Sequence, residues 1–202
     1  MLDAHRSSVD RLLVPLAERL RPVSPNVLSV LAFLSAVGAG FAFYFGVLLL
    51  AILFLFLNAL LDALDGKVAK LTGRESARGD FLDHVLDRYA DVIMIGGIAL
   101  GPHGDVVIGL FALLGVLLAS YMGTQAQAVG LGRAYGGVMG RADRLAILFF
   151  ATWIAVFADP LGRGGGPFVY TPLTLALVIF AVLGQFTAIQ RAVSAWRRLG
   201  AH

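Results

Sequence analysis

The stretch "DALDGKVAKLTGRESARGDFLDHVLD", residues 62–87, decides the fold because it places a cluster of carboxylates next to a long apolar block. The forty residues before it, 22–61, contain no charged side chain. A membrane-spanning helix needs roughly 20 apolar residues, so this block is about the right length for two spans. The second span must end inside the quoted stretch, and a third must begin there. The aspartates therefore lie where two expected membrane helices meet the membrane surface.

The composition of the chain is that of an integral membrane protein. Of its 202 residues, 58% are hydrophobic and 14% are charged, whereas a soluble domain carries about 25% charged residues. The length leaves no room for a separate soluble domain, so we expect one membrane domain over residues 1–202. The chain has no cysteine, which excludes disulfides and thiolate chemistry. The net charge of +3 is modest, and we expect no nucleic-acid partner.

The apolar segments predict an all-α fold with six membrane-spanning helices. The block 22–61 divides into two spans near Gly46, and the charge-free segment 106–132 gives the fourth. The predicted third, fifth and sixth spans cover residues 79–101, 140–158 and 167–190. Together the spans form a six-helix bundle over residues 22–198.

The positions of the basic residues orient this bundle. With six spans, both termini share one side of the membrane with the loops between the second and third spans and between the fourth and fifth. Fifteen of the sixteen Lys and Arg residues fall on that side, and only Arg163 falls on the other. Because basic loops stay in the cytoplasm, we expect a multi-pass protein of the cell membrane with its termini and the acidic stretch on the cytoplasmic side.

Residues 1–21 form a smaller predicted element. The leucines between positions 2 and 20 fall near one helical face and the charges mostly elsewhere, which is typical of an amphipathic helix lying in the membrane interface. Pro15 predicts a kink in it. The alternative is a partly ordered polar tail. Ser24 followed by Pro25 makes a good N-cap and first residue for the first span.

Spacing selects four of the aspartates in the quoted stretch. Asp62 and Asp65 share one helical face, and Asp83 and Asp87 share a face on the next helix. Since a short loop makes the two helices antiparallel neighbours, the two pairs can face each other. Four carboxylates at membrane depth repel one another, and divalent cations remove that repulsion. Carboxylate oxygens suit Mg²⁺ or Mn²⁺, and two such ions, which would balance four negative charges, commonly serve displacement at phosphorus.

Small and basic residues lie on the same two helices. Gly66, Ala69 and Gly79 leave a groove beside the carboxylates, where a diphosphate could approach the backbone. The alternative is that these small residues serve close helix packing. Three basic residues could contact phosphates or simply meet lipid headgroups at the interface: Lys70, Arg74 and Arg78.

The full pattern runs D-x-x-D-G-x-x-A-K from Asp62 to Lys70, then G-x-x-x-D-x-x-x-D from Gly79 to Asp87. It resembles the motif of the CDP-alcohol phosphotransferase family, D-x-x-D-G-x-x-A-R-x8-G-x-x-x-D-x-x-x-D, with every spacing matched. The one departure is Lys70 in the usual arginine position, which keeps the charge but loses the two-pronged guanidinium. The six predicted spans, the amphipathic N-terminal helix and "SPN" at residues 24–26 also resemble the family.

The resemblance implies a reaction and a division of roles. A CDP-linked lipid donates its phosphatidyl-type group to the hydroxyl of an acceptor alcohol, and CMP leaves. The implied general base is Asp87, which could also ligate a metal. The other implied metal ligands are Asp62, Asp65 and Asp83. The residues implied to bind the CDP-lipid are Gly66, Ala69, Lys70, Arg74 and Gly79. Family members are commonly homodimers, which implies the same for this chain.

The identity of the acceptor alcohol is the open question. Four arginines are expected on the cytoplasmic side near the carboxylates, and such a cluster suits an acceptor that carries a phosphate. They are Arg133, Arg141, Arg144 and Arg191. The segment "GRADRL", residues 140–145, resembles an R-x-E-R segment of inositol-phosphate-using members, although Gly123 and Gln125 stand where the bacterial ones tend to have Lys and Arg. The alternative is that these arginines anchor lipid headgroups.

Two further segments, "GDFLDHVLDRYADV" (79–92) and "SYMGTQAQAVGLGR" (120–133), resemble archaeal members of the family, some of them archaetidylinositol phosphate synthases. On this resemblance we expect transfer of a phosphatidyl or archaetidyl group to inositol phosphate. Glycerol 3-phosphate and then serine are the alternative acceptors. An ion- or proton-coupled transporter is a different class of candidate, because intramembrane aspartates also mark ion pathways. The position of the aspartates near one face and the lack of an internal repeat speak against it.

Three polar residues lie beside the motif. Asp80 is expected to cap the third span, where a negative charge suits the helix dipole. Asp91 lies one turn deeper than Asp87, where a charge usually has a partner, so we expect a contact with a basic or polar group. His84 is expected to point off the aspartate face as an interfacial packing residue.

Overall fold

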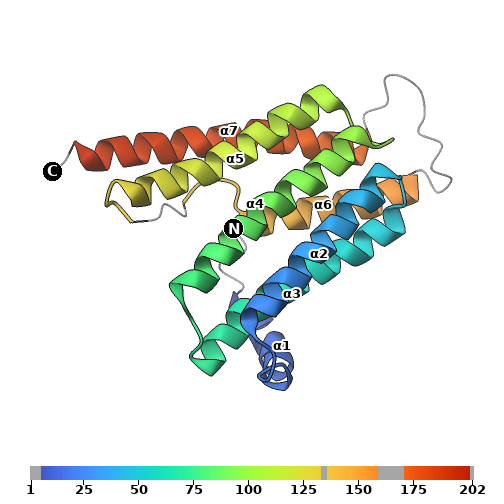
Figure 1. Cartoon of the computed structure of the whole chain (residues 1–202). Coiled ribbons are helices and arrows are strands. Elements are labelled where there is room, and N and C mark those ends of the chain that lie inside the picture. The colour runs from blue at the N-terminus through green and yellow to red at the C-terminus, as the bar shows by residue number, and fades with distance from the viewer. Residues whose placement is uncertain (1–5, 133–135, 159–170, 201–202) are drawn as a thin grey trace.

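The computed structural model describes residues 6–132, 136–158 and 171–200, and within these ranges every regular element is an α-helix. Figure 1 shows long helices running beside one another, with the short α1 next to the C-terminal end of α3. The helices are α1 (Arg6–Arg19), α2 (Pro25–Tyr44), α3 (Leu48–Thr72), α4 (Ala77–Leu100), α5 (Val106–Ala128), α6 (Arg141–Ala158) and α7 (Pro172–Leu199). The expected all-α fold is confirmed.

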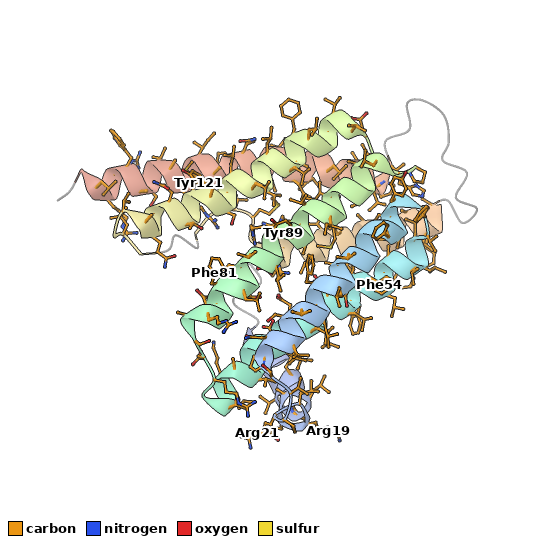
Figure 2. All side chains as sticks on the ribbon, viewed as in Figure 1. Arg19, Arg21, Phe54, Phe81, Tyr89 and Tyr121 are labelled. Atoms are coloured by element: carbon orange, nitrogen blue, oxygen red, sulfur yellow. The ribbon has the colours of Figure 1, made fainter. Side chains whose placement is uncertain are left out.

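Four helices are long and apolar enough to cross a membrane: α2, α3, α5 and α7. The sequence predicts six spans, and the two that fall short are α4 and α6. In both helices the charged residues lie in the first part. The six charged residues of α4 fall between Arg78 and Asp91, and α6 begins with Arg141, Asp143 and Arg144. The rest of each helix is apolar. Exposed aromatic rings on α4, at Phe81 and Tyr89, point away from the bundle (Figure 2).

The helix boundaries follow local backbone chemistry. Gly46 has a φ of 72°, a left-handed conformation that glycine adopts without strain, and it forms the expected turn between α2 and α3. Ser24 occupies the N-cap position of α2 as expected, although its side chain makes no capping hydrogen bond. At α4 the capping role expected of Asp80 belongs to Ser76, whose side chain accepts a hydrogen bond from the Gly79 N–H at 3.1 Å. Asp80 lies in the first turn of α4, where its charge suits the helix dipole as expected.

The last helix differs most from its predicted range. α7 is described from Pro172 and continues to Leu199, nine residues beyond the expected end at Gln190. The predicted start of this span at residue 167 lies outside the described residues. Arg133 and Arg163 also lie outside them. The polar residues after Gln190 extend the helix past the apolar segment, so hydropathy alone underestimates its length.

The N-terminal helix packs on the end of α3. Ala17 is fully buried in a small cluster with Leu28, Leu64 and Val68, and Leu13 and Leu20 pack against its margin. The basic end of α1 remains exposed at Arg19 and Arg21 (Figure 2). The side of α1 that carries Leu13, Ala17 and Leu20 is thus buried, whereas Leu16, which the leucine spacing places on the same apolar face, is 37% exposed.

α2 packs against both α3 and α4 and so holds together the two helices that carry the aspartates. The contact with α4 is very close: a Cβ atom added at Gly97 would lie 2.1 Å from the Gly40 carbonyl oxygen. No side chain larger than hydrogen fits there without moving one of the two backbones. The position of α4, and of its aspartates, therefore depends on this glycine contact.

We expect Gly97→Ala to lower the free energy of unfolding by about 1–3 kcal/mol, because the added methyl group overpacks the contact between α2 and α4. The matched control is Gly96→Ala, since a Cβ atom at Gly96 meets nothing within 4 Å. That control should be neutral or stabilising by up to about 1 kcal/mol, as alanine favours the helix. Thermal unfolding of the detergent-solubilised variants measures both effects. Equal melting temperatures for the two would contradict the close contact.

Candidate metal and substrate site

The predicted carboxylates converge between α3 and α4. Oxygen atoms of Asp62 and Asp65 on α3 and of Asp83 on α4 lie within 4.8 Å of one another. The sequence predicts α3 and α4 as neighbours packed on each other, whereas in the structure each packs chiefly on α2. This arrangement leaves a small hollow between the helices rather than a tight helix interface, and its polar lining residues are Ser29, Asn58, Asp62, Asp83, Asp87 and Arg141.

Asp65 is held in place from α2. Its side chain is buried, with 7% of the residue exposed, and the Ser29 hydroxyl donates a hydrogen bond to its Oδ2 atom at 2.6 Å. Asn58 lies about two turns from Asp65 on α3, and its side-chain amide donates to the Ala32 carbonyl oxygen of α2 at 2.9 Å. A buried carboxylate that receives only neutral donors, from Ser29 and from the Gly66 backbone, keeps an uncompensated charge, which favours a cation beside it.

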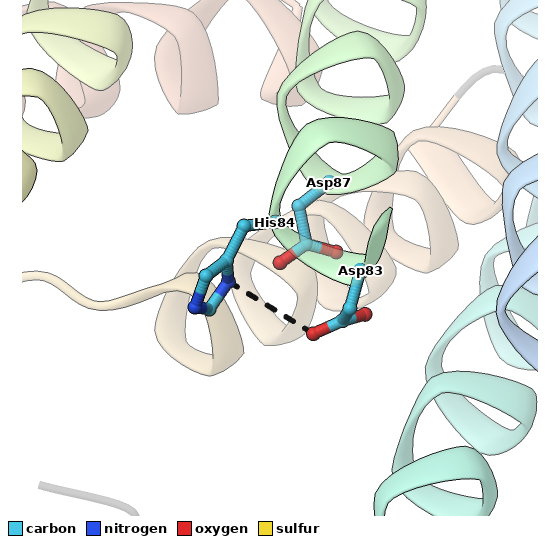
Figure 3. Close-up of side chains that lie close together, drawn as sticks. All are labelled: Asp83, His84 and Asp87. Atoms are coloured by element: carbon cyan, nitrogen blue, oxygen red, sulfur yellow. Dashed lines mark ion pairs between the residues drawn. The ribbon is translucent and has the colours of Figure 1, made fainter. Parts of the chain in front are cut away.

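A second acidic group lies on α4 alone. Asp83, His84 and Asp87 offer ligand atoms within 4.8 Å of one another, and Figure 3 shows the three side chains gathered on one side of the helix. His84 lies 3.9 Å from Asp83 through Nδ1 and 3.1 Å from Asp80 through Nε2. The expectation that His84 merely packs at the interface was therefore wrong. Its spacing of four residues from Asp80 and three from Asp87 was the signal that could have placed it here.

Arg141 reaches into the carboxylates from α6. Its Nη1 atom lies 2.5 Å from Asp62 Oδ1, and its Nη2 atom lies 2.9 Å from Asp87 Oδ1. One guanidinium thus joins an aspartate of α3 to an aspartate of α4. Arg88 approaches the other oxygen of Asp87 at 3.5 Å. This places one of the expected acceptor-binding arginines directly at the candidate site.

The other expected arginines lie elsewhere. Arg144 pairs with Asp91 at 2.8 Å, which confirms that Asp91 has a basic partner. Arg191 donates from Nε to the Gly136 carbonyl oxygen at 2.7 Å and from Nη1 to the Ala119 carbonyl oxygen at 2.6 Å. Arg191 therefore holds the segment before α6 against α5 and α7. Arg133 lies outside the described residues.

The small residues of the motif divide into two kinds. Gly66 faces open space, since a Cβ atom there would meet nothing within 4 Å, and this fits a groove that admits substrate. A Cβ atom at Gly79 would lie 3.3 Å from Asn26 Oδ1 and from Ser76 Oγ, so close packing explains Gly79. Ala69 is half-buried. Lys70 and Arg74 are exposed at the end of α3.

The donor set fits a hard divalent cation. The clustered side chains offer carboxylate oxygens almost exclusively, with one histidine at the edge, and oxygen-rich sites of this kind select Mg²⁺ or Mn²⁺. Residues that pattern reasoning missed are Ser29, which stands in an uncharged segment, and Arg88, whose spacing of three residues from Asp91 was available in the sequence.

Known proteins resemble this chain in sequence and in structure over nearly its whole length. Archaetidylinositol phosphate synthase of Methanothermobacter thermautotrophicus is 32% identical over 199 residues, which cover 98% of this chain and 96% of that protein. Phosphatidylinositol phosphate synthase of Mycobacterium tuberculosis with CDP-DAG bound has a similar structure, with a TM-score of 0.76, 26% identity, and coverage of 92% of this chain and 94% of that one.

A second structure of the mycobacterial enzyme, in complex with manganese and citrate, also has a TM-score of 0.76 at 26% identity, with coverage of 91% of this chain and 88% of that one. The family profile described as CDP-alcohol phosphatidyltransferase matches residues 22–196. This range contains α2 to α6, all but the last three residues of α7, and every aspartate of the candidate site. The chain is therefore a membrane protein that belongs to the CDP-alcohol phosphatidyltransferase family.

Proposed function

We propose that this protein transfers a phosphatidyl or archaetidyl group from a CDP-linked lipid to a hydroxyl of inositol phosphate and releases CMP. The observation that carries the proposal is the convergence of Asp62, Asp65, Asp83 and Asp87 around Arg141. Carboxylates that hold cations suit a diphosphate donor, and a guanidinium at the same place suits a phosphorylated acceptor. The named activities of the relatives, and the CDP-DAG bound to one of them, support the same donor and acceptor.

Asp62, Asp65, Asp83 and Asp87 would hold two divalent ions, Mg²⁺ or Mn²⁺. When bound, such ions neutralise the charge on the donor diphosphate and on the departing CMP. Manganese in the structure of the mycobacterial relative supports a divalent ion of this kind. Gly66 would let the diphosphate approach the backbone of α3, because nothing fills the space beside it. The other residues proposed to bind the CDP-lipid are Ala69, Lys70, Arg74 and Gly79.

Asp87 would act as the general base. A hydroxyl is a poor nucleophile at neutral pH and needs a carboxylate within hydrogen-bond reach. Asp87 would take the proton from the acceptor hydroxyl while the oxygen attacks the lipid-side phosphorus, and the bond from that phosphorus to the CMP oxygen would break. The position of Asp87 beside both Asp83 and Arg141 supports this role, since the base would then lie between the donor and the acceptor.

Arg141 would hold the phosphate of the acceptor, with Arg133, Arg144 and Arg191 as further candidates from the sequence. Among those that the structure describes, Arg141 is the one that lies at the carboxylates. Glycerol 3-phosphate would use the same guanidinium and is the first alternative acceptor. Serine has no phosphate and would leave Arg141 without a function in acceptor binding, so it is the weaker alternative.

The proposed setting is a six-span bundle over residues 22–198 with an interfacial helix in residues 1–21, which together make one domain. The termini and the site would lie on the cytoplasmic side of the cell membrane, where CDP-linked donors and phosphorylated polyols meet. The length of α4, which is 24 residues, and the absence of charge after Asp91 support its crossing of the membrane. A homodimer is proposed by analogy with the family.

The decisive experiment is an assay of CMP release by the purified protein with a CDP-linked lipid and Mg²⁺ or Mn²⁺. Inositol phosphate, glycerol 3-phosphate and serine are compared as acceptors at equal concentration. We expect release above the acceptor-free background with inositol phosphate first. Failure of all three acceptors to release CMP would overturn the enzymatic proposal. Ion flux in proteoliposomes without CMP release would instead support the transporter.

We expect Arg141→Ala to raise the KM for inositol phosphate by about tenfold or more, because truncation removes a charge-assisted contact to the acceptor phosphate. The KM for the CDP-lipid should change by less than about threefold, since the proposed donor residues lie on α3 and α4. Arg197→Ala, at an exposed arginine in the last turn of α7, is the matched control. Equal changes in both KM values would show that Arg141 does not discriminate the acceptor.

A further inference from the structure

Two ion pairs connect α6 to α4 in register. Arg141 Nη2 lies 2.9 Å from Asp87 Oδ1, and Arg144 Nη2 lies 2.8 Å from Asp91 Oδ2. The arginines are three residues apart on α6 and the aspartates four residues apart on α4, so each couple shares one face of its helix. We call the Arg141–Asp87 contact the outer pair and the Arg144–Asp91 contact the inner pair.

The inner pair is closed off from solvent. Asp91 is 4% exposed and Arg144 is 6% exposed. Arg88 approaches the same Asp91 oxygen at 3.1 Å, so one carboxylate serves two guanidiniums. Buried charges are tolerated only when their partners are well placed, and removal of one partner leaves an uncompensated charge. The inner pair therefore favours a single position of Arg144 along α4.

The backbone of α6 packs chiefly on α3 and α7 rather than on α4. The long arginine side chains bridge the remaining distance to α4. A slip of α6 by one residue would shift it by about 1.5 Å and rotate its side chains by about 100° relative to α4. Such a slip would break the inner pair and withdraw Arg141 from both Asp62 and Asp87.

We propose that Asp91 is a positioning residue: through Arg144 it sets the register of α6 against α4 and so places Arg141 where the acceptor phosphate binds. The proposal rests on the acceptor role proposed for Arg141. Asp91 itself does not bind the acceptor, because its carboxylate is buried and would repel a phosphate. The inner pair fixes geometry, and the outer pair lies at the reaction site.

The test is the double variant Asp91→Asn with Arg144→Gln, which removes both charges of the inner pair. Arg88, the second partner of Asp91, is half-buried and keeps Asp87 as a partner at 3.5 Å. We expect kcat/KM for inositol phosphate to fall by about 10- to 100-fold, mostly through KM, since a small displacement of a binding group has effects of this size. The KM for the CDP-lipid should stay within about threefold of wild type. The single variant Asp91→Glu keeps a carboxylate opposite Arg144, so its loss of kcat/KM for inositol phosphate should be smaller than that of the double variant.

Asp143→Asn is the charge control, because Asp143 is the neighbour of Arg144 and accepts a hydrogen bond from the Gly140 N–H at 2.9 Å, which an asparagine oxygen can also accept. Its acceptor KM should equal that of wild type. A folded double variant with an unchanged acceptor KM would overturn the positioning role, and so would equal losses for donor and acceptor. Absence of CMP release by the wild type with inositol phosphate would contradict the proposed function. Normal release by the wild type and an unchanged acceptor KM in the double variant would contradict only the positioning role of Asp91.

Discussion

Asp87→Asn is expected to reduce CMP release by about 10²- to 10⁴-fold, the range that general-base catalysis contributes. Asparagine keeps the size of the side chain but cannot accept the proton of the acceptor hydroxyl. Binding of the CDP-lipid should remain largely intact, because Asp62, Asp65 and Asp83 still offer their clustered oxygens. Single-turnover measurements of CMP release, combined with a direct donor-binding assay, separate the two effects.

Asp80→Asn is the matched control for Asp87→Asn. Asp80 stands on the same helix, two turns nearer the N-terminus, and its side chain is 70% exposed. It should keep nearly all activity. Full activity of Asp87→Asn would remove the general-base role. Loss of donor binding together with turnover would show that Asp87 acts mainly as a metal ligand.

Removal of divalent cations is expected to abolish CMP release completely. Without a cation, the carboxylates of Asp62, Asp65 and Asp83 repel the donor diphosphate instead of holding it. We expect chelation with EDTA to stop the reaction and added Mg²⁺ or Mn²⁺ to restore it. Bound manganese, counted by elemental analysis in the presence of the donor, tests whether two ions bind.

The matched variant for this experiment is Asp65→Asn. It should lower the affinity for Mn²⁺, measured by electron paramagnetic resonance of the free ion, by at least about tenfold, because a neutral amide replaces a charged ligand. Activity that persists after exhaustive chelation would contradict the metal site. Unchanged Mn²⁺ affinity in Asp65→Asn would remove Asp65 from the ligand set.

The sequence predicted the carboxylate cluster because the spacing of its aspartates follows the helical period. Asp62 with Asp65, and Asp83 with Asp87, could be assigned to two faces without knowledge of the tertiary structure. The small residue Gly66 and the basic partner of Asp91 could also be anticipated. These features depend on local spacing or on the cost of a buried charge, and both can be read from one chain.

The remaining features depend on tertiary contacts that spacing does not encode. Ser29 lies more than thirty residues from Asp65, in a segment without any charge, so nothing local indicates their hydrogen bond. Arg141 reaches the carboxylates, whereas Arg191 binds backbone carbonyl oxygens elsewhere. This difference follows from where α6 and α7 lie, which the positions of the basic residues in the sequence do not specify. His84 was misplaced because only its neighbour Asp83 was considered and not its partners one turn away. Length and hydropathy select four spanning helices rather than the six predicted, because the charges of α4 and α6 are concentrated in the first part of each helix.

The hydrogen bond from Ser29 to Asp65 has a consequence for coordination number. Since Oδ2 of Asp65 already accepts this bond, part of the hydrogen-bonding and ligating capacity of this carboxylate is used before any ion binds. An octahedral ion such as Mg²⁺ needs about six oxygens, so four carboxylates cannot complete two coordination spheres, and substrate oxygens and water must fill the rest. Ion and donor would then each strengthen the binding of the other by the same factor. Without its lipid substrate, the protein would hold these ions only weakly.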